Sequence, residues 1–490
     1  MNITSQKGDI LKTEAEVRVV GIYEGEDWEN SFIQRLGEET GGKLQINAKK
    51  KDFTGNAGQI LSFPDLLIVG LGKSETLSTA LREITGSVYS QLQSLPVTHV
   101  AFELFGEDDE SFDPNQTAQL MTEALLLASY QFDTYKKPKQ KNILEEIILI
   151  AEDGKDAIKA EKGIKKAKQI IDGVTVARDL VNTPAQDMNP IRLAQTAERI
   201  AKLGSHIRVR VYNREQIEKK NMNAFLAVAQ GSDVEPRLIH LTYKPEKAKK
   251  SIAIVGKGIT FDSGGLSLKP ADSMQSMKCD MAGAASVLGL FVVLAKLEPN
   301  IEVHGIIAAT ENMPSGKAMR PGDVVRAANK KTIEILNTDA EGRLTLADAL
   351  VYAQKQKVDT VIDLATLTGA CVVTLGEEIA GVMSNNSDLA HKLIESATVV
   401  GEELWELPLF GRYAKLVESD IADLRNIATS RYGGTLTAGL FLKEFIEEGQ
   451  KWAHIDIAGP AYAERPLSSY IGKGGTGYGV RTLVKWIESL

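Results

Sequence analysis

Hydrophobic and polar positions follow two different periods along this chain of 490 residues. In the first part, short apolar runs alternate with amphipathic stretches. The runs cover residues 17–20, 66–69, 99–104 and 147–151. Apolar runs of this length are typical of buried strands, and the stretches between them are typical of helices. The pattern predicts an α/β layer, in which the acidic segment 106–113 and the basic segment 135–141 are exposed loops.

A longer helical pattern follows. Apolar residues such as Ile164, Ile171 and Val181 recur at helical spacing, and Pro184 ends the pattern. We interpret this stretch as a helix that links two domains. Beyond it, helix and strand patterns alternate again: helices from about 191 and at 282–297, and strands at 207–211, 251–255, 303–308 and 358–364.

Such alternation predicts βαβ units and a mainly parallel sheet with helices on both faces. The predicted fold class is therefore α/β with two domains, each a mainly parallel or mixed sheet flanked by helices. The predicted boundaries are an N-terminal α/β domain at 1–155, a linker helix at 156–184 and a larger C-terminal domain at 185–490.

Composition limits the partners that we expect this protein to bind and the cellular compartment in which we expect it. The 57 basic and 65 acidic residues give a net charge of -8, which argues against a general nucleic-acid or anionic-membrane binder. The two cysteines, Cys279 and Cys371, form no CxxC pair, and the first residues lack a signal-peptide pattern, so we expect a cytoplasmic protein. The most apolar run, 284–295, is shorter than the ~20 residues of a membrane span and predicts a buried helix.

Charged residues are concentrated in two segments that each adjoin a predicted strand or helix. The first, VGKGITFDSGGLSLKPADSMQSMKCDMAG at 255–283, contains Lys257, Asp262, Lys269 and Asp280. It begins where a predicted strand ends. Ligands of open α/β sheets bind beyond the carboxyl ends of strands, so the segment is a candidate site.

The second segment is NTDAEGRL at 337–344, in which Asp339, Glu341 and Arg343 alternate. An extended backbone would point these three side chains to one side, and a turn at Gly342 would still make them converge within a few residues. Each charged residue of the two segments, taken alone, could equally be a turn former, a helix cap or a structural ion pair. Only the joint pattern of two charged clusters, each beside a strand end, favours a site.

The four carboxylates of these segments would carry four negative charges into a partly buried cleft, at a cost on the order of several kcal/mol. Two divalent cations would cancel that charge. Oxygen ligands without Cys or His suit Mg²⁺, Mn²⁺ or Zn²⁺. The six histidines are scattered and form no HExxH, which excludes a zincin built on that motif.

Two other motifs favour ordinary turns. FDSGG at 261–265 would make Ser263 the nucleophile of a trypsin-like protease, but that fold is all-β and usually disulfide-bonded. GLGKS at 70–74, with Lys73, lacks the first glycine of a P-loop, because Leu67 stands there.

NTDAEGRL resembles the signature of the leucyl (cytosol) aminopeptidase family. The segments VGKGITFDSGGLSLKP and MKCDMAGAA resemble the other metal-site segments of that family. The likeness extends to DLATLTGA at 363–370, HIDIAGPA at 454–461 and TGYGVRTL at 476–483, over about 300 residues of the C-terminal part. The N-terminal part matches the family in its general α/β character.

The resemblance implies two divalent metal ions per subunit, Mn²⁺ or Zn²⁺ with Mg²⁺ as a third candidate. Asp262 and Glu341 would bridge the two ions, Lys257 and Asp280 would complete the tighter site, and Asp339 would complete the more exchangeable one. It also implies that Lys269 polarises the scissile carbonyl and that Arg343 holds a bicarbonate acting as general base. The implied pocket for the first side chain is lined by Met277, Thr366, Gly369, Ala458 and Ala461.

The expected activity is therefore removal of N-terminal residues, with Leu and other apolar residues preferred, by a metal-bridged hydroxide. A free amine on the substrate would be required, and the family implies a homohexamer. Two alternatives stay open: a DNA-binding accessory protein on the same scaffold, and another two-metal hydrolase such as a phosphoesterase.

Overall fold

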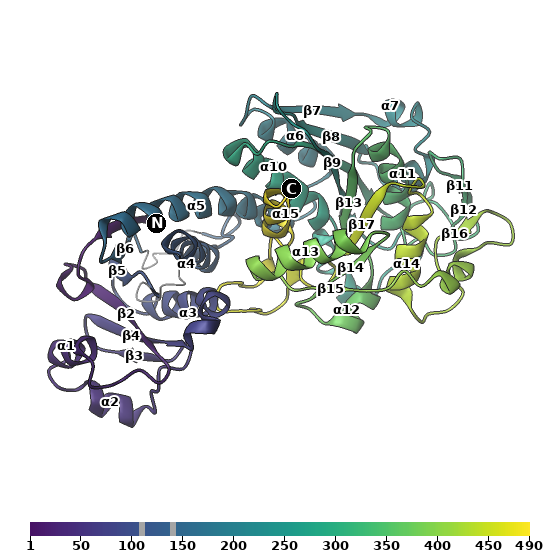
Figure 1. The fold of residues 1–490 in the computed structure, drawn as a ribbon. Helices are drawn as coiled ribbons and strands as arrows, with labels where there is room; N and C mark the ends of the chain where they lie inside the picture. The colour runs from purple at the N-terminus through teal and green to yellow at the C-terminus, as the bar shows by residue number, and fades with distance from the viewer. Residues whose placement is uncertain (107–112, 138–143) are drawn as a thin grey trace. The chain divides into compact units, whose positions relative to one another are not determined.

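The structure is a computed structural model that describes residues 1–106, 113–137 and 144–490. Most of the predicted acidic loop and the end of the predicted basic loop lie outside the described residues. The chain divides into two compact units: residues 1–171 with 466–472, and residues 172–465 with 473–490. Each unit is a sheet flanked by helices (Figure 1), so the predicted fold class is confirmed.

The first unit contains a six-stranded sheet in the order β1-β6-β5-β2-β4-β3. Strands β2, β4, β5 and β6 fall where the apolar runs predict them. The bounds of the six strands are β1 Asn2–Lys7, β2 Val17–Tyr23, β3 Ile60–Ser62, β4 Leu66–Gly72, β5 His99–Glu103 and β6 Glu146–Ala151. Strands β1 and β3 are partly exposed edge strands, and for this reason they leave no apolar run in the sequence.

Helices cover both faces of this sheet. One core includes residues from α3 and α4 and from the first part of α5, and the core on the opposite face includes residues from α1 and α2. The bounds are α1 Ser31–Glu39, α2 Leu44–Lys50, α3 Leu77–Leu92, α4 Pro114–Ser129 and α5 Gly154–Asn182. The domain boundaries predicted at 155 and 184 stay predictions.

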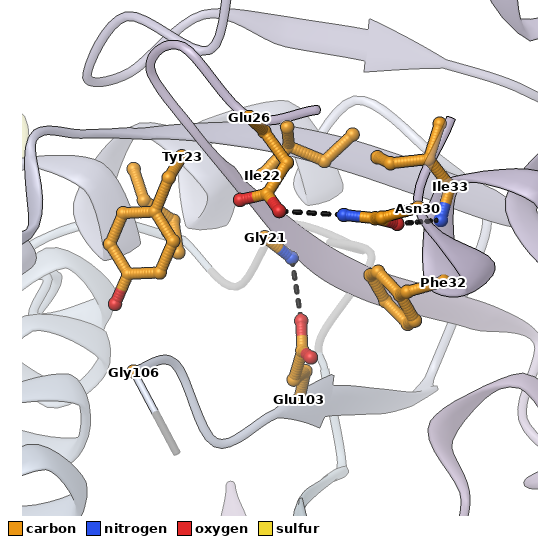
Figure 2. A pocket seen from close by; sticks show the side chains of 10 residues that line it. Gly21, Ile22, Tyr23, Glu26, Asn30, Phe32, Ile33, Glu103 and Gly106 are labelled. Atoms are coloured by element: carbon orange, nitrogen blue, oxygen red, sulfur yellow. Dashed lines mark hydrogen bonds between the residues drawn. The ribbon is translucent and has the colours of Figure 1, made fainter. Parts of the chain in front are cut away.

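A cavity of about 60 Å³ lies beyond the carboxyl ends of β2, β4 and β5 (Figure 2). Two hydrogen bonds tie its polar lining together: the backbone N–H of Gly21 donates to Glu103 over 2.7 Å, and Asn30 donates to Glu26 over 2.6 Å. Asn30 also caps α1. Small-molecule sites have volumes of roughly 300 Å³ or more, so this cavity is too small for one. The two hydrogen bonds give Glu26, Asn30 and Glu103 a structural role. The GLGKS segment forms the end of β4 and the turn after it, as predicted.

The second unit contains an eight-stranded mixed sheet in the order β15-β14-β17-β13-β9-β10-β8-β7. Its four central strands, β17, β13, β9 and β10, are parallel. The four predicted strands are confirmed, and β9 continues beyond the prediction to Asp262. The bounds are β7 Ile207–Tyr212, β8 Arg237–Tyr243, β9 Ser251–Asp262, β10 Glu302–Asn312, β13 Thr360–Ala365, β14 Ala380–Ser384, β15 Leu404–Glu406 and β17 Lys451–Asp456.

Helices flank this sheet as well, and α8, α11 and α14 share one core with β9, β10 and β13. The helices are α6 Pro190–Ile200, α7 Arg214–Glu218, α8 Asn223–Val228, α9 Ala271–Met274, α10 Ala282–Leu297, α11 Gly342–Gln354, α12 Gly369–Leu375, α13 Ser387–Val400, α14 Gly434–Lys443 and α15 Val480–Glu488. A short helix, η4 Met277–Cys279, precedes α10. A small sheet is formed by β11 Val324–Arg326, β12 Thr332–Glu334 and β16 Leu424–Arg425.

Helix α10 contains the most apolar run of the chain. The stretch Ala271–Leu297 is long and apolar enough to cross a membrane, but 83% of its most apolar window is buried inside the protein. A buried core helix has the same composition as a membrane span, and the burial of α10 on all sides accounts for it. The predicted buried helix is confirmed.

Candidate metal centre

Three carboxylates from distant parts of the chain meet at the carboxyl edge of the central strands. Asp262 ends β9, Asp280 follows η4, and Glu341 directly precedes α11. Each offers one oxygen, and these oxygens lie within 4.8 Å of one another. All three side chains are buried. The carboxyl end of β9, the turn before α10 and the start of α11 thus bring together the two charged segments that the sequence places far apart.

Glycines permit this close approach. Gly264 and Gly265 have φ angles of +85° and +63°, which let the chain turn sharply after β9. A Cβ on Gly265 would stand 2.8 Å from Asn312 Oδ1. At Gly342, a Cβ would stand 2.6 Å from Lys257 Nζ. Side chains at these positions would push apart the groups that make the cluster.

Two lysines lie between the carboxylates. The ammonium of Lys257 is 2.7 Å from Asp280 Oδ1 and 2.9 Å from Glu341 Oε1, and it donates to the carbonyl of Thr366 over 2.9 Å. The ammonium of Lys269 is 3.0 Å from Asp262 Oδ2 and 2.6 Å from Asp339 Oδ1. The structure therefore brings together all five predicted metal ligands and Lys269.

Burial and the neighbouring charges raise the pKa of three acids of the cluster, and the surrounding carboxylates raise the pKa of its two lysines. Burial raises the pKa of Asp280, Glu341 and Asp339, and the neighbouring carboxylate of Asp262 raises all three further. Burial by itself lowers the pKa of Lys257, but the surrounding carboxylates outweigh it, so this pKa lies above its ordinary value. If all six groups are ionised, the four acids and two ammonium groups leave two net negative charges in a site that is mostly buried.

The donor set fits additional cations. Within the part of the chain that the structure describes, the buried oxygens Asp280 Oδ2 and Glu341 Oε2 have no hydrogen-bond partner. Unpaired carboxylate oxygens in a buried site are costly unless a cation neutralises them. Hard or borderline divalent cations prefer such oxygens. Lys257 could add a nitrogen ligand after losing its proton.

Arg343 lies close behind the cluster, on the first turn of α11. Its guanidinium is buried, donates from Nη1 to the carbonyl of Asn426 over 2.8 Å, and has an Nε that lacks a partner among the described residues. Burial lowers the pKa of Arg343 to about 10, so the group stays charged at neutral pH. It is a fixed buried cation with a donor available for an anion.

Two hydrogen bonds to the carboxylates were not predicted from the sequence. Asn312 Nδ2 donates to Asp262 Oδ1 over 2.8 Å, and Thr366 Oγ1 donates to Asp280 Oδ1 over 2.8 Å. Asn312 ends β10 and is the register partner of Asp262. If the strand predicted at 303–308 had been extended to residue 312, the sequence would have placed Asn312 at the same sheet edge as Asp262. Thr366 was predicted to line the substrate pocket, and its hydroxyl and carbonyl both contact the cluster.

Comparison with known proteins identifies the relationship. Residues 175–484 match the model of the cytosol aminopeptidase family, catalytic domain, and residues 19–139 match the model of the N-terminal domain of the same family. The chain belongs to the cytosol aminopeptidase family. It is thus a hydrolase, a metal-dependent aminopeptidase whose substrates are peptides, and the resemblance drawn from the motifs is confirmed in both parts of the chain. This excludes a phosphoesterase as its family activity.

Curated relatives and solved structures match this chain along nearly its whole length. A probable cytosol aminopeptidase of Aquifex aeolicus (strain VF5) is 42% identical over 499 residues, covering 99% of this chain and 98% of the relative. One from Sulfurihydrogenibium sp. (strain YO3AOP1) is 39% identical over 496 residues, covering 99% and 97%. A mutant of tomato leucine aminopeptidase superposes with a TM-score of 0.91 at 37% identity, covering 100% of this chain and 97% of that one.

A second solved structure is the bottromycin maturation enzyme BotP in complex with Mn. It has a TM-score of 0.85 at 31% identity, and the match covers 97% of this chain and 99% of that one. That protein holds manganese on the same fold.

The residues predicted to line the aminopeptidase's side-chain pocket lie near the same sheet edge. Thr366 follows β13, Gly369 begins α12, and Ala458 follows β17. Met277 begins η4, and Ala461 is buried beyond β17. Their role in binding a side chain stays a prediction.

Proposed function

We propose that this aminopeptidase holds two divalent cations with Lys257, Asp262, Asp280, Asp339 and Glu341. Asp262 and Glu341 would bridge the two ions, Lys257 and Asp280 would complete the tighter site, and Asp339 would complete the exchangeable one. The observation that carries the proposal is the buried carboxylate cluster, with two oxygens unpaired among the described residues. Mn²⁺ or Zn²⁺ suits these donors, with Mg²⁺ as a third candidate, and the manganese complex of a structural relative supports Mn²⁺ as the first ion to test.

When bound, such cations activate a water molecule as the nucleophile and polarise the scissile carbonyl. The protein's own groups then do three things. Lys269 donates hydrogen bonds where negative charge develops on the carbonyl oxygen. Arg343 holds an anion, which we propose is bicarbonate acting as general base. Asp280, whose Oδ2 is unpaired among the described residues, accepts a hydrogen bond from the free amine of the substrate.

The proposed substrates are peptides with an apolar first residue, Leu preferred. Met277, Thr366, Gly369, Ala458 and Ala461 would line the pocket for that side chain. An apolar pocket discriminates by only about 1–3 kcal/mol per methylene, so the preference should be broad. We further propose a cytoplasmic homohexamer, on the resemblance to the family and on the name shared by the relatives.

The direct experiment measures p-nitroaniline release from Leu-p-nitroanilide by the Mn²⁺-loaded protein. EDTA should abolish the activity, and added Mn²⁺ should restore it. N-acetyl-Leu-p-nitroanilide should not be cleaved, because acetylation removes the amine. Comparable rates on the blocked and the free substrate would refute the amine requirement. A gel shift of duplex DNA with the same sample tests the DNA-binding alternative, and we expect none because of the net negative charge.

A further inference from the structure

Asn426 lies next to the segment that carries Asp339, Glu341 and Arg343, although it is more than 80 residues away in sequence. It directly follows β16, which pairs in parallel with β12. Its backbone N–H continues this pairing and donates to the carbonyl of Glu334 over 2.9 Å. The side chain is fully buried. Strand pairing therefore places this amide beside residues 336–341, the segment before α11 that we call the NTDAEGR loop.

Both polar atoms of the amide are bonded to that loop. Oδ1 accepts the backbone N–H groups of Leu336 and Asn337 over 2.9 and 3.3 Å. Nδ2 donates to the carbonyls of Asn337 and Ala340 over 2.7 and 3.4 Å. An amide offers two donors and one doubly accepting oxygen, so the loop uses the full capacity of this side chain.

The bonds continue from the loop to the charged residues. Asn337 Oδ1 accepts the backbone N–H of Asp339 over 2.8 Å. The carbonyl of Asn426 accepts Arg343 Nη1 over 2.8 Å. Glu341 directly follows Ala340, whose carbonyl Asn426 also contacts. Asn426 thus contacts the backbone on the N-terminal side of both acids and the guanidinium on their C-terminal side.

We propose that Asn426 is a positioning residue that sets the geometry of Asp339, Glu341 and Arg343 together. The inference rests on the roles proposed above for these three residues. The carbonyls of Asn337 and Ala340 face the Nδ2 amino group of Asn426. An aspartate carboxylate has no N–H to donate to them. A carboxylate at this position would turn oxygens toward the oxygens of Asn337 and Ala340, so the loop would have to move away.

The test compares Asn426→Asp with the wild-type enzyme in Mn²⁺ titrations of Leu-p-nitroanilide hydrolysis. Changing a residue that orients metal ligands typically costs about 10–100-fold in metal affinity or activity. We therefore expect the Mn²⁺ concentration for half-maximal activity to rise about tenfold or more. At saturating Mn²⁺, kcat should also fall about tenfold, because Arg343 is misplaced, while KM for the substrate should change less than about threefold.

Asn385→Asp is the control, at an asparagine that is exposed but makes comparable bonds. Asn385 makes the same kind of bonds, accepting from Trp452 N over 2.9 Å and donating to the carbonyl of Gln450 over 2.8 Å. These contacts lie at the amino end of β17, opposite the metal centre. We expect wild-type Mn²⁺ dependence and kcat for this variant. Asp339→Asn tests the proposed function separately and should be inactive.

The inference would be overturned if Asn426→Asp needed the same Mn²⁺ concentration as the wild-type enzyme and kept kcat within about twofold of it. The proposed function would remain intact. An equal loss in the Asn385 control would overturn it too, since the effect would then be general destabilisation. If Asn426→Asp does not fold, the same titration is made on Asn426→Ser, which keeps one acceptor. An unchanged Mn²⁺ dependence in that variant would likewise overturn the inference.

Discussion

Lys257 and Asp280 form an ion pair of 2.7 Å although each of their side chains is at most 5% exposed. Both charges have left water, so each depends on the other to offset its lost hydration, and Lys257 is paired with Glu341 as well. The centre is thus held by mutual charge as well as by any metal ion it binds. Changing Lys257 or Asp280 should lower stability, because the other charge stays buried without its partner. It should lower catalysis because a proposed metal ligand is removed.

Lys257→Met should destabilise the metal-free protein by about 3–5 kcal/mol, because it leaves buried carboxylates without their cation. Urea unfolding in EDTA measures the loss, and added Mn²⁺ should recover part of it. Lys269→Met is the control, since Lys269 is more exposed, at 16% of its side chain, and should cost less. Equal stability of Lys257→Met and the wild-type protein in EDTA would contradict the account of the ion pair.

Glu341→Gln should abolish turnover and lower the bound metal, because the carboxylate proposed to bridge both ions becomes a neutral amide. The expected loss in kcat is at least about 100-fold. Elemental analysis of the dialysed protein and steady-state kinetics on Leu-p-nitroanilide provide the two readouts. Near-normal kcat in this variant would dismiss the metal assignment.

Ser263→Ala should remain a metal-dependent hydrolase. Ser263 Oγ donates to the carbonyl of Asn312 over 2.7 Å and accepts the N–H of Gly265 over 3.1 Å, so its hydroxyl shapes the turn after β9. Its removal should lower stability by about 1–3 kcal/mol and leave most of the EDTA-sensitive activity. Thermal unfolding and kinetics check this. Collapse of activity with fold and metal content intact would instead indicate a serine nucleophile.

Stability should fall on acidification through a buried histidine pair. His240 Nε2 is 2.9 Å from His304 Nδ1, and His240 Nδ1 is 3.0 Å from the hydroxyl of Tyr352. Burial, assisted by the nearby charges of His304, Arg210 and Lys220, lowers the pKa of His240 from 6.5 to about 3. Between these two values the unfolded chain binds the proton and the folded protein does not. The free energy of unfolding should therefore fall as the pH drops from about 6.5, by up to about 1.4 kcal/mol per pH unit from this group.

Urea unfolding between pH 7.5 and pH 4.5 measures this slope. His240→Gln keeps hydrogen-bonding groups at the position but cannot take up the proton, so its slope should be smaller than that of the wild-type protein. His391→Gln is the control, because His391 is a surface residue at 65% side-chain exposure. The same slope in His240→Gln and the wild-type protein would assign the acid sensitivity to other groups.

The sequence by itself determined the fold class, most of the central strands and the residues of the metal centre. Runs such as 66–69 and 251–255 predict strands, because a strand that is buried on both faces of a sheet has a continuous apolar sequence. The dense charges of NTDAEGRL predicted a site, because carboxylates crowded into a partly buried cleft need cations. Edge strands β1 and β3 left no such signal, because half of each faces water.

Tertiary structure alone decided which polar residues support that centre. Asn312 reaches Asp262 because β9 and β10 pair in a particular register, and Asn426 reaches the NTDAEGR loop because β16 pairs with β12. An asparagine in the sequence looks the same whether its amide meets water or three residues of a distant loop. Hydrophobic periodicity reports burial along one element, whereas a hydrogen bond across more than 80 residues depends on the pairing of two elements, which local pattern does not encode.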